Sequence, residues 1–76
     1  MISINEASEA VKKEFDVKMY DVKAVKTDGR AFVFLCRSKD KDAIPDMMIV
    51  AVNKATGKLG YSVFDPDAAV KATLGG

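Results

Sequence analysis

Apolar and polar residues follow one period at the start of this chain and another in its middle. Near the start, apolar residues recur at spacings of three and four, which is the period of one face of an α-helix. They are Ile4, Ala7, Val11 and Phe15, with Ala10 beside them. The pattern predicts an amphipathic helix that ends near Phe15 and needs a partner to cover its apolar face.

Polar residues around this segment support the same helix. Ser3 and Glu6 have the spacing of a capping box, in which each side chain accepts a hydrogen bond from the backbone N–H of the other residue. Glu9 precedes Lys13 by four residues, which favours an exposed ion pair. We therefore expect the helix to begin directly after Ser3.

The middle of the chain has the two-residue period of β-strands. β-Branched residues alternate with charges from Tyr20 to Thr27, whereas the run Ala31–Cys36 is apolar on both faces, as in a central strand. Two further strands are predicted at Met47–Asn53 and Leu59–Phe64. Apolar residues point both ways in the second and third strands, so we expect part of the second sheet face to be covered too.

Three connections join these strands. Asp28-Gly29 is a hairpin signal, in which we expect Gly29 to adopt the positive φ of a tight turn. The segment Arg37–Asp46 is polar, and we predict that it forms a long loop. The segment Asn53–Lys58 reads as a turn in which Gly57 supplies the left-handed conformation.

The last segment fits a short helix. Asp65-Pro66 matches an N-cap followed by proline at the first helical position, and the helix would reach about Thr73 before Gly75-Gly76 stops it. The predicted fold class is therefore α+β. An N-terminal helix packs on an antiparallel meander sheet of three or four strands, and a short helix follows at the C-terminus.

Length and composition favour one small globular domain over residues 1–76. The chain is 49% hydrophobic and 30% charged, well outside the disordered range. A domain of this size buries only about 60% of the surface of its unfolded chain. It therefore has little stability to spare for a strained or polar active site.

The charge and the cysteine content further narrow the class of protein to which this chain can belong. The formal net charge is +1, so no overall field attracts nucleic acid or an anionic membrane. Cys36 is the single cysteine, which excludes an intramolecular disulfide. The N-terminus has no basic and apolar signal-peptide pattern, and no apolar run reaches membrane-spanning length. We expect a cytoplasmic protein, bacterial or from a phage, with no membrane partner.

The sequence does not match the common catalytic motifs. Thr56-Gly57-Lys58 resembles the end of a P-loop, but Val52 stands at the first glycine position and Leu59 follows the lysine. No histidine is present for a nucleophile–histidine pair. Cys36 lies in an apolar run and is expected to be a core side chain. We expect no enzyme activity, no cofactor and no small-molecule substrate.

The acidic residues of the long loop resemble the start of a calcium site. Asp40, Asp42 and Asp46 are spaced like its first ligands, but Ile44 and Pro45 stand where an EF-hand needs a ligand and a glycine. The neighbouring cations also neutralise the loop. We predict a solvated loop and no metal.

Nucleic-acid binding is the alternative function. Phe32 and Phe34 share one face of a strand, and aromatic residues on a sheet can stack on bases. A basic rim could come from Lys23, Lys26, Arg30, Arg37 and Lys39. Core packing is the favoured reading of the two phenylalanines.

Three segments together resemble the PepSY type of domain. They are I-S-I-N-E-A-S-E-A-V-K-K at the start, T-D-G-R-A-F-V-F in the middle and M-I-V-A-V-N-K-A-T-G-K-L after the loop. The likeness covers roughly residues 2 to 63, and small bacterial immunity proteins have a similar layout. Asn53 stands where the family usually has Asp, and the loop Arg37–Asp46 is longer than usual. The resemblance implies a binding or inhibitory module that restrains peptidases and has no catalytic residues.

The sequence therefore predicts a small non-enzymatic protein-interaction module of inhibitory, immunity or phage-accessory type. Its partner is another protein or a second copy paired at a sheet edge. Methionines adapt to irregular partner surfaces, although core packing is their commoner role. The predicted binding residues lie in and after the long loop: Arg37, Lys39, Asp40, Lys41, Asp42, Met47 and Met48.

Overall fold

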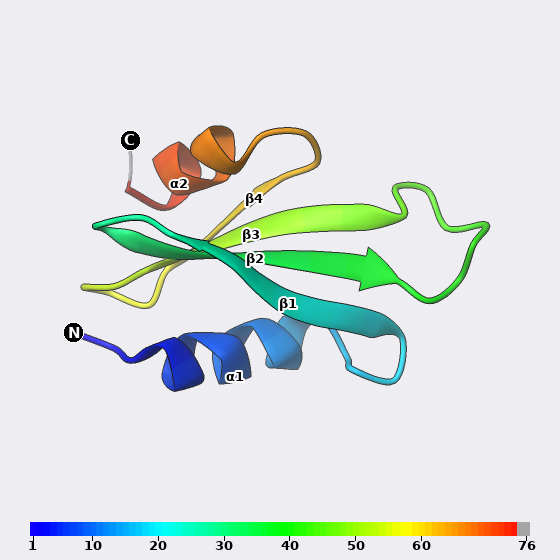
Figure 1. Cartoon of the computed structure of the whole chain (residues 1–76), viewed down its shortest axis with the longest axis horizontal. Helices are drawn as coiled ribbons and strands as arrows, with labels where there is room; N and C mark the ends of the chain where they lie inside the picture. The colour runs from blue at the N-terminus through cyan, green and yellow to red at the C-terminus, as the bar shows by residue number, and fades with distance from the viewer. Residues whose placement is uncertain (75–76) are drawn as a thin grey trace.

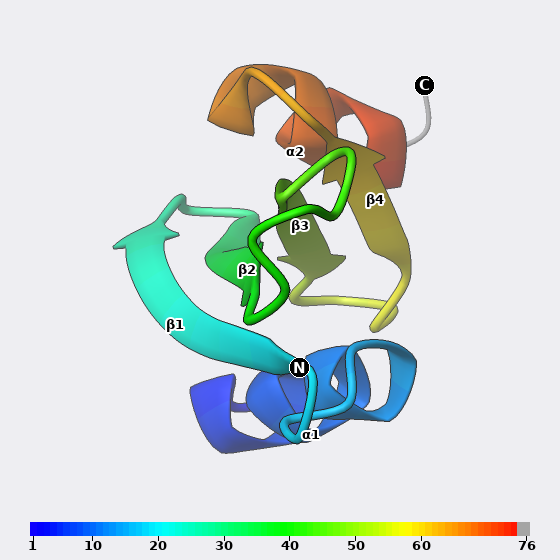
Figure 2. The same ribbon diagram turned by 90° about the vertical axis from the view of Figure 1, so that its right-hand side faces the viewer.

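Four antiparallel strands in the order β1-β2-β3-β4 form the centre of the computed structural model, which describes residues 1–74. One helix covers each face of this sheet, so the molecule has three layers (Figure 1, Figure 2). The elements in chain order are α1 (Ile4–Glu14), β1 (Tyr20–Thr27), β2 (Ala31–Ser38), β3 (Met47–Asn53), β4 (Leu59–Ser62) and α2 (Pro66–Leu74). This arrangement confirms the predicted α+β class.

Helix α1 begins as its sequence predicts. The Ser3 hydroxyl accepts a hydrogen bond from the Glu6 N–H at 3.1 Å, and the Glu6 carboxylate accepts one from the Ser3 N–H at 3.1 Å. The capping box is therefore confirmed, and Phe15 caps the other end. The predicted Glu9–Lys13 ion pair is not among the ion pairs found within 4.0 Å in residues 1–74.

The β1–β2 hairpin forms, but not through the predicted glycine conformation. Asp28 closes the turn, since its carboxylate accepts from the Arg30 N–H at 3.0 Å and its N–H donates to the Ala31 C=O at 2.9 Å. Gly29 does not have a positive φ. The prediction for Gly29 was wrong because the aspartate side chain supplies the hydrogen bond that a tighter turn would make in the backbone.

The turn between β3 and β4 is confirmed. Gly57 has a φ of 77°, the left-handed conformation that glycine adopts without steric cost. The Asn53 side chain accepts from the N–H groups of Ala55 and Thr56 at 2.8 and 3.2 Å. Its amide nitrogen also donates to the Thr73 C=O at 3.3 Å, which ties the turn to the end of α2. An aspartate at this position would have no such donor.

Two strand ends differ from the prediction. β2 extends to Ser38 because Arg37 still pairs with Asp21 on one side and with Met47 on the other. β4 ends at Ser62, two residues before Phe64, because the Ser62 hydroxyl accepts from the backbone N–H of Phe64 and Asp65 and turns the chain. Asp65 then caps α2 by accepting from the Asp67 N–H at 2.9 Å. The predicted stop at Gly75-Gly76 lies outside the described residues.

The sheet separates two hydrophobic clusters. The cluster on the α1 side contains the largest fully buried side chain, Phe34, whereas three of the five residues in the cluster on the α2 side are alanines. The expected cover on the second face is therefore confirmed. The α1-side cluster consists of Ala7, Val11, Phe34, Cys36, Val50 and Val52. The α2-side cluster consists of Ala31, Val33, Ile49, Ala51 and Ala69.

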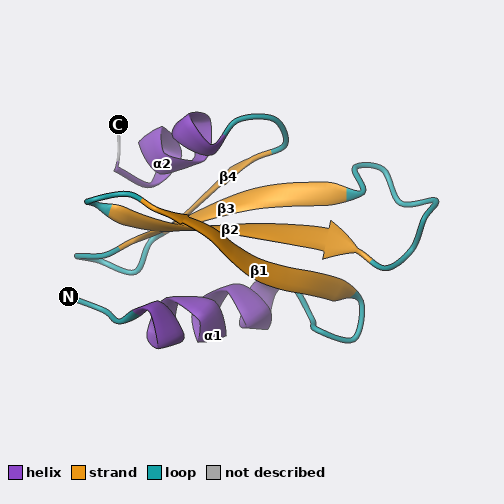
Figure 3. Ribbon diagram, in the orientation of Figure 1, coloured by secondary structure: helices purple, strands orange, loops and turns teal. Residues whose placement is uncertain are grey.

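The connections gather at two ends of the sheet. The β1–β2 and β3–β4 turns lie at one end, near the first residues of the chain, and the β2–β3 loop lies at the other (Figure 3). Within residues 1–74, neither helix has the length and apolar content needed to cross a membrane.

Candidate functional site

The residues predicted to bind a partner do not form one continuous surface. Arg37 and Met47 are opposite each other on β2 and β3. Met48 follows Met47 in the strand, so it points to the other face, where it packs against the α1-side cluster. The structure thus brings Arg37 and Met47 together and separates the two methionines.

The predicted loop residues Lys39, Asp40 and Asp42 are held by hydrogen bonds of both backbone and side-chain groups. The Lys39 N–H donates to the Met19 C=O at 2.9 Å, and its ammonium group donates to the Val17 C=O at 2.8 Å. Lys39 also lies 4.0 Å from the carboxylate of Asp21. Two further predicted residues, Asp40 and Asp42, form a turn in which the Asp40 carboxylate accepts from the Asp42 N–H. Lys41 is exposed between them.

Arg37 also lines a shallow depression on the α2 side of the sheet. The depression has a volume of about 320 Å³ and is formed by Asp21, Lys23, Leu35 and Arg37. Helix α2 does not cover this part of the sheet, because it packs mainly on β3 and β4 (Figure 2). A strip of β1 and β2 therefore remains open to solvent.

The two phenylalanines of the nucleic-acid hypothesis and two of its basic residues, Lys23 and Arg37, lie on opposite faces of the sheet. Phe34 is buried beneath α1, and the Lys54 ammonium group lies 4.8 Å from the ring centroid of Phe32. Lys23 and Arg37 are on the α2 side of the sheet. The two phenylalanines pack into or against the core, as favoured from the sequence.

The Cys36 thiol and the acidic side chains are the groups that bear on nucleophilic and metal chemistry. Cys36 is fully buried, and this burial raises the pKa of its thiol to about 11, which keeps it protonated at neutral pH. No three His, Cys, Asp or Glu side chains in this part of the chain converge on a point that could hold a metal ion.

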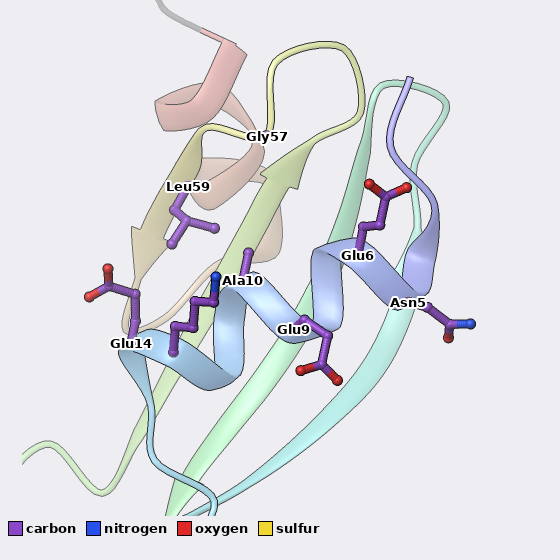
Figure 4. A pocket seen from close by; sticks show the side chains of 8 residues that line it. Asn5, Glu6, Glu9, Ala10, Glu14, Gly57 and Leu59 are labelled. Carbon is purple, nitrogen blue, oxygen red and sulfur yellow. The ribbon is translucent and has the colours of Figure 1, made fainter.

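A larger depression lies between α1 and β4, and it was missed by the sequence analysis. Its volume is about 520 Å³, and Figure 4 shows its lining residues. They are Asn5, Glu6, Glu9, Ala10, Lys13, Glu14, Gly57 and Leu59. We call this depression the α1–β4 groove. Ala10 lies beside the apolar stripe of α1, and that position was the available sequence signal.

The α1–β4 groove has an apolar floor and a predominantly acidic side. Ala10 and Leu59 are half-buried, and Leu59 packs against the α1-side cluster. Neither Glu9 nor Glu14 has a cation within 4.0 Å among the described residues. The pKa of Tyr61, the next outward residue on β4, is raised by burial and then by the negative charge of Glu14.

The outer edge of β4 offers backbone groups beside this groove. The Asn53 N–H donates to the Lys58 C=O at 2.9 Å, and Leu59 pairs with Val52 at the next position. Hydrogen-bonded and non-hydrogen-bonded pairs alternate along an antiparallel ladder. Leu59 and Tyr61 therefore direct their N–H and C=O groups away from β3, toward the open edge of the sheet.

No protein-family model, curated protein or solved structure matches this chain.

Proposed function

We propose that this protein is a non-enzymatic peptide-binding module that takes an extended segment of a partner protein onto β4. The observation that carries the proposal is the α1–β4 groove, which runs along an open strand edge. A segment added to such an edge gains affinity from main-chain hydrogen bonds and specificity from side chains that enter the adjacent groove.

The chemistry of the groove suggests the kind of segment that fits. Ala10 and Leu59 provide a floor for an apolar side chain. Glu9 and Glu14 carry carboxylates that lack a neighbouring cation. We therefore propose a partner segment in which a lysine or arginine is close to an apolar residue. The resemblance to PepSY domains supports the further proposal that binding restrains the partner.

The test is selection of peptides from a random displayed library on the immobilised chain, followed by affinity measurements on the selected peptides. Enriched peptides should carry a basic residue near an apolar one. The double variant E9K/E14K should weaken their binding roughly tenfold, since an exposed charge pair contributes up to about 1 kcal/mol. Amide chemical shifts should change at Ala10, Leu59 and Tyr61.

The matched control is D40K/D42K, which makes the same change in net charge in the β2–β3 loop. It should leave the affinity within about twofold, because long-range charge effects are screened over about a Debye length. Loss of binding in D40K/D42K but not in E9K/E14K would move the site to the loop. Selection of no peptide at all would contradict strand addition at β4.

A further inference from the structure

The opposite margin of the sheet, strand β1, also has an open edge (Figure 2). The Lys39 N–H donates to the Met19 C=O, and the Ser38 N–H donates to the Asp46 C=O on the other side of β2. These two bonds define the phase of the alternating ladder. Val22, which pairs with Cys36, is at a non-hydrogen-bonded position and directs its N–H and C=O groups to the open edge.

The sequence around Val22 is complementary to itself when read in the opposite direction. The segment is M-Y-D-V-K-A-V, from Met19 to Val25. Asp21 and Lys23 are one residue before and after Val22. Met19 and Val25, two exposed apolar residues, are three residues before and after it.

This symmetry matters because two identical strands that pair antiparallel are related by a two-fold axis. If the axis passes between the two Val22 residues, Asp21 of each copy is opposite Lys23 of the other. Opposite charges at directly facing positions stabilise an antiparallel pair, and like charges there destabilise it. The same register brings Met19 near Val25 and leaves the outward Val22 groups hydrogen-bonded to each other.

Neighbouring registers lack this match. An axis through Lys23 would place the two Lys23 side chains opposite each other, and an axis through Asp21 would do the same for the two carboxylates. An axis through Ala24 would leave Lys23 opposite Val25. The bulge between Ala24 and Lys26 limits any longer pairing.

The charges needed for this pairing are available. Among residues 1–74, Lys23 has no carboxylate within 4.0 Å. Asp21 has Lys39 at 4.0 Å, but the Lys39 side chain is about half exposed and that of Asp21 is largely exposed, so this contact is weak and exchangeable. The open backbone groups of β1 and its side-chain charges thus both favour pairing with β1 of a second copy.

We infer that β1 is a self-association edge, at which a second copy of this chain pairs antiparallel about Val22. The two sheets then join into one, with both copies of α1 on the same face. The open strips that contain Leu35 and Arg37 become neighbours on the other face. The two α1–β4 grooves lie at the outer margins, so the dimer presents two of them. This inference rests on β1 alone and does not depend on what the grooves bind.

A charge-swap experiment tests the register. Sedimentation velocity should show a concentration-dependent increase in mass for the native chain between micromolar and millimolar concentration. D21K and K23D should each weaken dimerisation about tenfold or more, because each places like charges opposite one another at two positions. An equimolar mixture of D21K and K23D should associate again, since each copy then faces opposite charges. The double variant D21K/K23D should dimerise alone.

Cysteine cross-linking provides a second readout that does not depend on charge. Val22→Cys should form a disulfide-linked dimer under mild oxidation, because the two positions 22 face each other. Thr27→Cys, on the same strand, should not, since its two copies lie at opposite ends of the pairing. Position 22 lies directly opposite the native Cys36 on β2, so the experiment is done in a Cys36→Ala background, which removes the competing intramolecular disulfide.

The outcomes separate clearly. Association of the D21K and K23D mixture, with Val22→Cys cross-linking, supports the inference. A native chain that remains monomeric at millimolar concentration overturns it. A native dimer whose charge variants associate unchanged would also overturn it, because the contact would then lie elsewhere. Circular dichroism of each variant shows whether it is folded, and recovery in the mixture excludes misfolding as the cause of loss.

Discussion

The two faces of the sheet hold their helices by different physical means. On the α1 side, large side chains such as Phe34 and Val11 fill the space between helix and sheet. On the α2 side, Gly60 allows the helix backbone to approach the strand directly, since an added Cβ would lie 2.6 Å from the Thr73 nitrogen and closer still to the Ala69 oxygen. The α1 side is filled by a buried aromatic ring, whereas on the α2 side smaller side chains are combined with a close backbone approach at Gly60.

This difference explains which helix can border a binding groove. Helix α1 is separated from the sheet by side chains, so a depression remains where those side chains are small, as at Ala10. Helix α2 lies on the backbone of β4 and is further held by hydrogen bonds from Asn53 and Thr73. The close contact leaves little space between α2 and β4, and the groove forms on the other side.

The largest expected loss of stability comes from removing a large side chain from the core between α1 and the sheet. Phe34→Ala should reduce the free energy of unfolding by about 3–5 kcal/mol, because it removes a fully buried aromatic ring and leaves a cavity. Urea denaturation would measure this loss. The matched control is Phe64→Ala, at a side chain that is 88% exposed, which should change stability by less than about 0.5 kcal/mol. Equal effects at the two positions would contradict the assignment of the core.

The next largest loss of stability comes from adding a side chain where α2 lies directly on β4. Gly60→Ala should destabilise the protein by about 1–3 kcal/mol, because the new methyl group meets the backbone of α2 rather than a movable side chain. Gly29→Ala is the control, since a Cβ there meets nothing within 4 Å and φ is not positive. The control should be neutral or slightly stabilising. Thermal unfolding of both variants would detect the difference, and a neutral Gly60→Ala would show that α2 is not seated this closely.

The smallest effect separates the two roles of Asn53. Asn53→Asp keeps the oxygen that accepts from Ala55 and Thr56 but loses the amide donor to the Thr73 C=O. It should cost about 1 kcal/mol and speed amide hydrogen exchange at the end of α2. Asn53→Ala removes both roles and should cost more. Equal losses in the two variants would mean that the contact with Thr73 contributes nothing.

Local chemistry accounts for the features that were correctly anticipated. The capping box at Ser3, the left-handed Gly57 and the cap at Asp65 involve residues close in sequence, so a short segment contains all the groups that decide the structure. The periods of apolar residues likewise indicated α1 and the strands, and the Asp65-Pro66 pair indicated α2. The hairpin at Gly29 formed for another reason. The Asp28 carboxylate accepts a hydrogen bond from the Arg30 N–H, and Gly29 does not adopt a positive φ.

The groove depended on contacts between distant segments. Nothing near Ala10 in the sequence shows that Leu59 will lie across from it, and the charges of Glu9 and Glu14 become a feature only when β4 runs alongside. Met47 and Met48 separate for a local reason, since adjacent residues of a strand point to opposite faces of the sheet. Local propensities thus specify the elements of this protein, whereas its surfaces arise from the packing of α1 and α2 on the sheet, because a surface is shared by residues that only the folded chain brings together.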